Sequence, residues 1–246
     1  MIELNVRANQ AATCKFRDFE LYRSVVKDTA SKVKGTRVII LVHGFNVKHG
    51  QSTKAYEGIR EIWSGNQLET TEIIGYSWPS SLAGGGPAAY HAARQRTQEA
   101  GRRLAELITA ISERGINVSV LGHSLGTVVM GHASVYLNDN RDLYSCLWDH
   151  AAFHAGDARL KMYRADSDFG QAMRQLGIKT YNYYAKTDSV LQLSKLALNG
   201  KRIGRHELVR PLGINIDAVK LHGERVNHGT YKGSDNILAD TLTRLQ

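Results

Sequence analysis

The chain has 246 residues, and 32 basic against 23 acidic side chains give it a formal net charge of +9. A hydrophobic content of 42% with only 3 prolines excludes a disordered, collagen-like or low-complexity chain. No apolar run approaches the roughly 18 residues of a membrane span, and the N-terminus lacks the basic and apolar regions of a signal peptide. Cys14 and Cys146 are too few for a disulfide framework. We therefore expect one cytoplasmic domain over residues 1–246.

Short β-rich runs alternate with helical stretches along the chain, a pattern typical of βα units around a mostly parallel sheet. This predicts an α/β fold of three layers, with helices on both faces of the sheet. Residues 1–36 are expected to add one or two edge strands and a helix to the core of residues 37–246. Within that core we expect strands at 37–42, 72–78, 117–121, 146–152, 179–184 and 216–221, and helices at 51–64, 90–114, 127–137, 168–176, 189–199 and 235–245.

The pentapeptide Gly122-His123-Ser124-Leu125-Gly126 stands between a buried strand and a buried helix of this prediction. A nucleophile in such a tight turn has unfavourable backbone angles, and the flanking glycines let the helix and the strand approach closely. The turn lifts the serine hydroxyl clear of the sheet and directs the free N–H groups of the helix N-terminus at developing negative charge. The pattern therefore predicts Ser124 as a nucleophile.

A serine nucleophile needs a base within hydrogen-bond reach and a group that orients this base. Reactive groups gather at the carboxyl ends of parallel strands. His228 follows the last predicted strand and Asp188 follows the preceding one, which gives the chain order Ser, Asp, His of one known class of serine hydrolases. Two alternatives stay open, Asp157 as the acid and His222 as the base. A second role for Asp188 is that of N-cap for the helix that follows it.

Acyl transfer also needs two backbone N–H groups that converge on the developing oxyanion, one of them from the residue after the nucleophile. Leu125 supplies the first N–H. The second is expected from the loop after the first core strand, where Gly44 permits a close backbone approach and the Phe45 N–H is best placed. His43 and His123 neighbour this site, and we expect them to pack or to orient loops rather than to transfer protons.

Three motifs, HGFN, WPS and GHSLG, occur in this order along the chain before the acid and the base. Together they resemble the α/β-hydrolase superfamily, and within it a bacterial group of serine-hydrolase-like domains of unknown function. The resemblance covers roughly residues 37 to 240. It implies the same five site residues, with Ser124 as nucleophile, Asp188 and His228 as its partners, and Phe45 and Leu125 as oxyanion donors.

The sequence predicts a serine esterase for small or medium acyl groups. The segment between the strands at 146–152 and 179–184 has room for one crossover helix and not for a large lid. Neither cysteine has a neighbouring zinc partner, so we expect no metal or cofactor. A small-molecule ester is expected to lie against a substrate pocket built from His43, Gly44, Trp78, Leu82, Phe153 and Leu191.

The same residues suit a phospholipase, a thioesterase or an acyltransferase, because these enzymes share the tetrahedral intermediate and differ in pocket shape and water access. Another hypothesis is a non-catalytic module that binds an anionic partner through the basic stretch after residue 200. This stretch lacks interleaved aromatic residues for base stacking, so a solvated loop is the simpler interpretation. Its basic side chains are Lys201, Arg202, Arg205 and Arg210.

Overall fold

The structure is a computed structural model that describes residues 2–5, 19–64, 70–81, 86–144, 146–198, 200–207, 216–221 and 226–246. Its strands form one parallel sheet in the order β1-β3-β2-β4-β5-β6-β7. Each of the predicted core strands is found within two residues of its expected bounds. In chain order the strands are β1 (Ile2–Asn5), β2 (Arg37–Val42), β3 (Thr71–Ser77), β4 (Asn117–His123), β5 (Trp148–His154), β6 (Lys179–Tyr184) and β7 (Ile216–Lys220).

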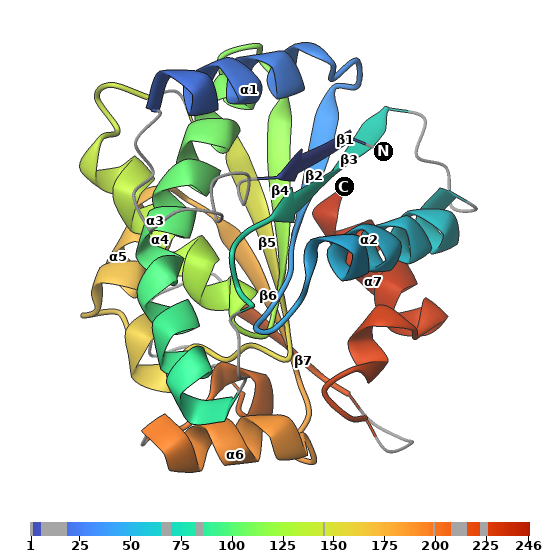
Figure 1. The fold of residues 1–246 in the computed structure, drawn as a ribbon, viewed down its shortest axis with the longest axis vertical. Coiled ribbons are helices and arrows are strands. Elements are labelled where there is room, and N and C mark those ends of the chain that lie inside the picture. Colours follow the sequence, from blue (N-terminus) through green and yellow to red (C-terminus); the bar gives the residue numbers. More distant parts are fainter. Residues whose placement is uncertain are drawn as a thin grey trace.

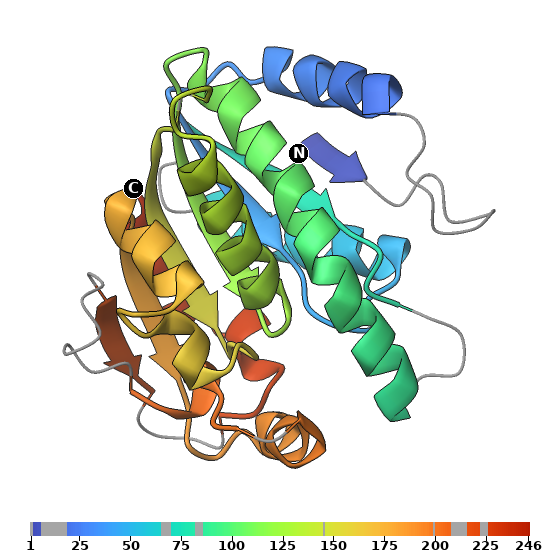
Figure 2. The ribbon, with the colours of Figure 1, turned by 90° about the vertical axis from the view of Figure 1, so that its left-hand side faces the viewer.

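Helices cover both faces of the sheet, which confirms the predicted three layers (Figure 1). One face carries α1 (Phe19–Ser31), α3 (Gly86–Ser112), α4 (Gly126–Asp139) and α5 (Asp168–Gln175) (Figure 2). On this face α3 contacts both α1 and α4, and α4 contacts α5. The other face carries α2 (His49–Ser64) and α7 (Asp235–Leu245). The other described helical elements are η1 (Leu160–Tyr163), α6 (Ser189–Leu198), η2 (Ile203–Arg205) and η4 (Thr230–Lys232).

The sequence of β2 explains why helices are needed on both faces. Its last five residues are all buried. Val38, Ile40 and Val42 pack into the core beneath α3 and α4, whereas Ile39 and Leu41 pack into the second core beneath α2 and α7. Because alternate residues of a strand point to opposite faces, a strand that is apolar throughout buries its side chains only between two helical layers.

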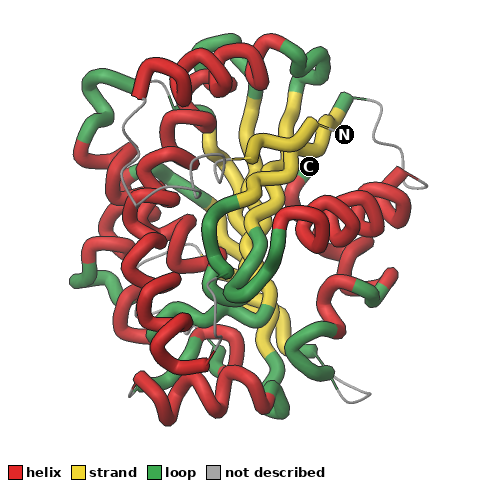
Figure 3. The backbone as a smooth tube through the Cα atoms, viewed as in Figure 1, coloured by secondary structure: helices red, strands yellow, loops and turns green. Residues whose placement is uncertain are grey.

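The direction in which the chain winds changes between β2 and β4. From β2 the chain continues through α2 to β3 on one side, and from β4 it continues through α4 to β5 on the other side. Val42 and Gly122 are paired near the carboxyl ends of these neighbouring strands, so the loops that follow them leave the same edge of the sheet (Figure 3). Parallel α/β sheets bind their ligands in the crevice at such a point.

The N-terminal part adds an edge strand and a helix to this core. β1 pairs with β3 at the edge of the sheet, and α1 packs on α3. Cys146 is a half-buried free thiol, whereas Cys14 lies outside the described residues. None of the described helices is both long and apolar enough to cross a membrane.

Candidate active site

The turn from β4 into α4 holds Ser124 in a backbone conformation that few residues adopt. Its φ is +54°, in the left-handed region, which costs a non-glycine residue about 1–3 kcal/mol. The Ser124 N–H donates to the His154 carbonyl at 2.9 Å. The Ser124 carbonyl accepts the Asp157 N–H at 3.0 Å and the Thr127 N–H at 3.1 Å. The strained residue is therefore held by the end of β5 on one side and by the first turn of α4 on the other.

Both glycines of the pentapeptide let neighbouring atoms come closer than a side chain would allow. A Cβ at position 126 would lie 2.5 Å from the Val42 carbonyl oxygen, and a Cβ at position 122 would lie 2.3 Å from the Met130 sulfur. Such distances are too short for any carbon side chain, so α4 reaches its place against β2 and β4 only because Gly122 and Gly126 have none.

Ser124, His228 and Asp188 form a continuous chain of hydrogen bonds. His228 Nε2 lies 2.9 Å from Ser124 Oγ, and His228 Nδ1 lies 2.9 Å from Asp188 Oδ2. Asp188 is fully buried, and the His228 side chain is 17% exposed. Because the carboxylate accepts a hydrogen bond from Nδ1–H, Nε2 is left to accept the hydrogen bond of the serine hydroxyl. The structure thus brings together the three residues that the sequence analysis singled out.

The two oxygens of the Asp188 carboxylate have different partners. Oδ2 accepts from His228, and Oδ1 accepts the Leu191 N–H at 3.0 Å in the first turn of α6. The two roles that the sequence offered for Asp188, N-cap and partner of the histidine, are therefore compatible. One carboxylate both begins α6 and fixes the imidazole.

Asp157, the alternative acid, is engaged elsewhere. Its Oδ1 accepts from Ser194 Oγ at 2.6 Å and lies 3.2 Å from Nε of Arg202, which is fully buried. Its Oδ2 accepts from the Tyr90 hydroxyl. With both oxygens occupied, Asp157 connects α3, α6 and the segment before η2 and does not contact His228. His222, the alternative base, lies outside the described residues.

The loops after β2 and β3 are locked together through His43. Its Nε2 accepts the Trp78 N–H at 3.1 Å, its carbonyl accepts the Trp78 indole N–H at 2.7 Å, and the two rings stack with centroids 5.7 Å apart. Ser80 adds two further links, because its carbonyl accepts the Asn46 N–H at 3.1 Å and its Oγ accepts the Val47 N–H at 3.2 Å. The HGFN and WPS motifs are therefore one structural unit, in which His43 orients the loop.

This unit brings the backbone at Gly44 against the serine. A Cβ at position 44 would lie 2.7 Å from Ser124 Cβ and 3.3 Å from Ser124 Oγ. The next N–H along the loop belongs to Phe45, and Leu125 supplies the N–H directly after the serine. Within the described part of the chain, neither of these two N–H groups donates a backbone hydrogen bond, as the sequence analysis expects of oxyanion donors.

Residues 20–244 match the sequence family described as "Alpha/beta hydrolase of unknown function (DUF900)". The chain belongs to this family. No match was found among curated proteins.

Two solved bacterial structures show the same fold at low sequence identity. The product of the gene lin2722 from Listeria innocua has a TM-score of 0.53 at 12% identity, over 85% of this chain and 93% of that chain. A protein of Bacillus cereus described as uncharacterized has a TM-score of 0.52 at 14% identity, over 85% of this chain and 60% of that chain. A Trichoderma reesei cutinase has a TM-score of 0.45 at 12% identity, over 92% and 88% of the two chains.

In this α/β hydrolase His123 supports the loop that carries His228. Its Nε2–H donates to the His228 backbone carbonyl at 2.9 Å, and the two ring centroids lie 4.9 Å apart. Burial lowers the pKa of His123 well below its ordinary value of 6.5, so the ring is neutral. Its Nδ1 is buried and has no hydrogen-bond partner among the described residues. The sequence analysis expected an orienting role here, and this contact is compatible with one.

The substrate pocket predicted from the sequence needs correction. Trp78, Phe153 and Leu191 have no exposed surface, belong to the two cores of the α/β hydrolase and do not line the cavity beside the Ser124 turn. The prediction failed because apolar residues beside a motif on a buried strand or helix point into the core as readily as into a pocket. Leu82 lies outside the described residues.

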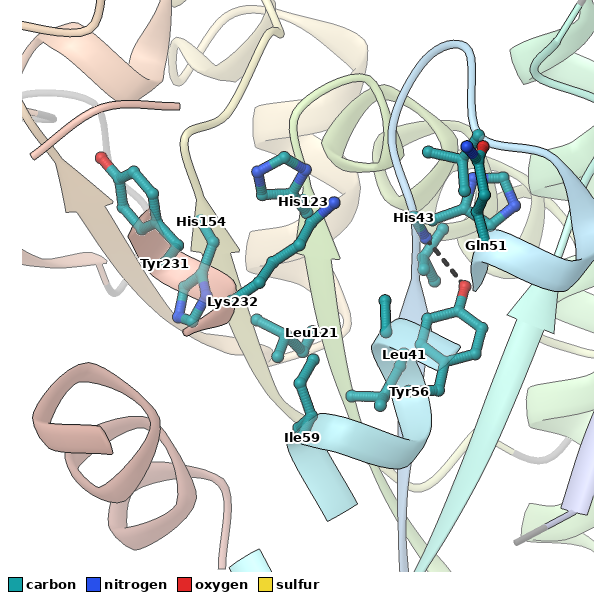
Figure 4. Close-up of a pocket in the computed structure, with 13 residues that line it drawn as sticks. Leu41, His43, Gln51, Tyr56, Ile59, Leu121, His123, His154, Tyr231 and Lys232 are labelled. Atoms are coloured by element: carbon teal, nitrogen blue, oxygen red, sulfur yellow. Dashed lines mark hydrogen bonds between the residues drawn. The ribbon is translucent and has the colours of Figure 1, made fainter. Parts of the chain in front are cut away.

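A cavity of about 250 Å³ adjoins the Ser124 turn on the face covered by α2 and α7 (Figure 4). Of the predicted pocket residues, His43 lines it, whereas Gly44 does not. The other lining residues were not predicted from the sequence, because they come from five separate elements with no shared motif. These residues include Leu41, Ile59, Leu121, Tyr231 and Lys232.

The basic stretch after residue 200 also differs from the expectation. Arg202 is buried in the ion pair with Asp157 and is not available to an anionic partner. Arg205 donates to the Lys186 carbonyl and to Gln192, whereas Arg210 lies outside the described residues. Lys201 is exposed. This hydrolase therefore does not expose all four basic side chains on its surface.

The described residues offer no metal centre. They contain no group of three or more His, Cys, Asp or Glu side chains placed to hold an ion. His150 and His154 have the four-residue spacing that binds zinc on a helix, but they lie on strand β5, where four residues span about 13 Å.

Proposed function

We propose that this α/β hydrolase cleaves carboxylic esters of small or medium acyl groups through an acyl-enzyme. The observation that carries the proposal is the hydrogen-bond chain from Ser124 through His228 to the buried Asp188. A serine hydroxyl is a weak nucleophile near neutral pH, and a histidine base oriented by a carboxylate is the arrangement that activates it.

In the proposed reaction Ser124 Oγ attacks the ester carbonyl carbon while His228 Nε2 takes its proton. The Asp188 carboxylate stabilises the imidazolium that forms, and the Phe45 and Leu125 N–H groups stabilise the oxyanion. His228 then gives the proton to the leaving alkoxide, which departs as an alcohol. A water molecule, activated by the same histidine, cleaves the acyl-enzyme and releases the acid.

Hydrolysis of 4-nitrophenyl acetate, butyrate and octanoate, beside a thioester and an anilide of butyrate, tests the reaction and its acyl range. We expect Ser124→Ala to lower kcat by about 10³-fold or more and to leave the melting temperature nearly unchanged, because it removes one hydroxyl. The matched control is Ser64→Ala, at an exposed serine of α2, which should keep its activity. A Ser124→Ala variant with most of the wild-type kcat contradicts the proposal.

A further inference from the structure

The cavity beside the Ser124 turn has an aliphatic floor. Leu41 and Leu121 come from the adjacent strands β2 and β4, and Ile59 comes from α2 (Figure 4). The volume of about 250 Å³ corresponds to about eight water molecules at their liquid volume. The space therefore fits one short hydrocarbon chain or a single ring.

One positively charged side chain enters this apolar space. Lys232, at the end of η4, is half-buried, and no Asp or Glu is among the lining residues. No ion pair or hydrogen bond of the Lys232 ammonium occurs within the described chain. In Figure 4 the Lys232 side chain extends toward the region between His123 and His43. Burial lowers the pKa of Lys232. A half-buried cation without a counter-ion is stabilised by any anion that reaches it.

The cavity is next to the reacting groups. His43 and His123 line it, and they directly precede Gly44 and Ser124 in the chain. His123 Nε2–H donates to the His228 backbone carbonyl. A ligand that contacts His123 is therefore one side chain away from the loop that carries His228. A group bound here therefore contacts the residue that precedes Ser124, although Ser124 and His228 themselves do not line the cavity.

We propose that this cavity receives the part of the substrate that carries a carboxylate, with the Lys232 ammonium as its counter-ion and the aliphatic floor against its hydrocarbon chain. The inference rests on the proposed ester hydrolysis and names its substrate class, which is the esters of short acids or alcohols that bear a free carboxylate.

Two pairs of esters test this assignment. In the first pair, 4-nitrophenyl butyrate is compared with mono-4-nitrophenyl glutarate, which adds a carboxylate at the acyl end. In the second pair, phenyl butyrate is compared with 4-carboxyphenyl butyrate, which adds the carboxylate on the alcohol side. For each enzyme the ratio of kcat/KM for the charged and the neutral ester is measured, so that a general loss of activity cancels.

We expect Lys232→Met to lower this ratio by about 10- to 100-fold for one of the two pairs, mainly through KM, because a hydrogen bond to a charged group is lost. Lys232→Arg should restore most of the ratio. Lys27→Met, at an exposed lysine of α1 on the opposite face, is the matched control and should leave the ratio as in the wild type. Ratios that are the same in wild type and Lys232→Met for both pairs overturn the inference.

A binding measurement separates this inference from the proposed reaction. Calorimetric titration of Ser124→Ala with glutarate measures binding to the cavity without turnover. Adding Lys232→Met should weaken the affinity for glutarate by about 10-fold or more. Equal glutarate affinity with and without Lys232→Met overturns the assignment of Lys232 even where esters are hydrolysed. Absence of all ester hydrolysis, with glutarate binding that depends on Lys232, overturns the proposed reaction and leaves the carboxylate specificity of the cavity in place.

Discussion

At the scale of single residues, two buried aspartates have separate tasks. Asp188 gives one oxygen to His228 and the other to the start of α6, whereas Asp157 gives both oxygens to Ser194, Arg202 and Tyr90. A carboxylate that orients an imidazole affects catalysis through its tautomer. A carboxylate that neutralises a buried guanidinium affects folding, because removing it leaves an uncompensated charge.

Replacing each aspartate by asparagine should therefore give opposite results. Asp188→Asn keeps the cap on α6 but turns an amide N–H toward His228 Nδ1, and we expect kcat to fall by about 10³- to 10⁴-fold with little loss of stability. Asp157→Asn leaves Arg202 without its carboxylate, and we expect the free energy of unfolding to fall by about 3–5 kcal/mol while the folded enzyme keeps its kcat. Urea unfolding and steady-state kinetics on both variants check this. A large loss of kcat in Asp157→Asn, with kcat retained in Asp188→Asn, would assign the catalytic role to Asp157 instead.

At the scale of elements, the close packing of α4 on β2 positions Ser124. A Cβ at position 126 would meet two backbone oxygens, those of Val42 at 2.5 Å and His43 at 2.8 Å. Backbone atoms of a central strand cannot turn away as a flexible side chain does, so the start of α4 has to move. Ser124 stands two residues before this point and moves with it.

Gly126→Ala should consequently lower both stability and activity. We expect a loss of about 1–3 kcal/mol in the free energy of unfolding and at least a tenfold loss in kcat. Gly58→Ala in α2 is the matched control, because a Cβ there meets nothing within 4 Å, and it should stabilise the protein by up to about 1 kcal/mol. Thermal unfolding and steady-state kinetics on Gly126→Ala and Gly58→Ala measure these changes in stability and kcat. A Gly126→Ala enzyme as stable and active as wild type would show that the position of α4 does not depend on the close approach of Gly126 to β2.

Elements and their order were predictable from the sequence because their signals are local. The continuous apolar run of β2 indicates a strand buried on both faces, and the strand, turn and helix around Ser124 lie in one short segment. The choice between Asp157 and Asp188 was not predictable, since each follows a parallel strand. What separates them is Arg202, which is 45 residues away from Asp157 in the chain and reaches it only in the folded protein.

At the scale of the whole molecule, burial keeps His154 neutral and makes stability depend on pH. Burial lowers the pKa of His154 to about 3, whereas an unfolded chain binds this proton near pH 6.5. Its Nε2 lies 2.8 Å from Thr241 Oγ1, whose hydroxyl hydrogen already goes to the Ile237 carbonyl, so His154 is the donor. The stabilisation is fully present above pH 6.5 and is lost progressively as the pH falls toward 3.

We expect His154 to contribute about 2 kcal/mol to the loss of stability between pH 7.5 and pH 5.0. His154→Gln should be less stable at pH 7.5, because its packing is altered, but should lose about 2 kcal/mol less than wild type over this interval. Urea unfolding at the two pH values measures the difference. Parallel pH profiles for the two proteins would contradict a neutral, buried His154.

The cavity is also a property of the whole molecule and had no sequence signal. Ile59 lies on α2, Leu121 on β4 and Lys232 on η4, and only the winding of the chain across both faces brings them together. Trp78 is the opposite case: it belongs to a sequence motif and was predicted to line a pocket, but its side chain lies in the core. Side-chain direction at such positions depends on which helical layer covers the strand.

We propose that His228 activates Ser124 as a nucleophile, and covalent labelling of the folded protein with a fluorophosphonate probe is the decisive measurement. Peptide mass spectrometry should find the probe on Ser124, and labelling should be lost in His228→Ala, which removes the base 2.9 Å from the hydroxyl. Folded protein that resists the probe, or labelling that persists at full rate without His228, would contradict the account.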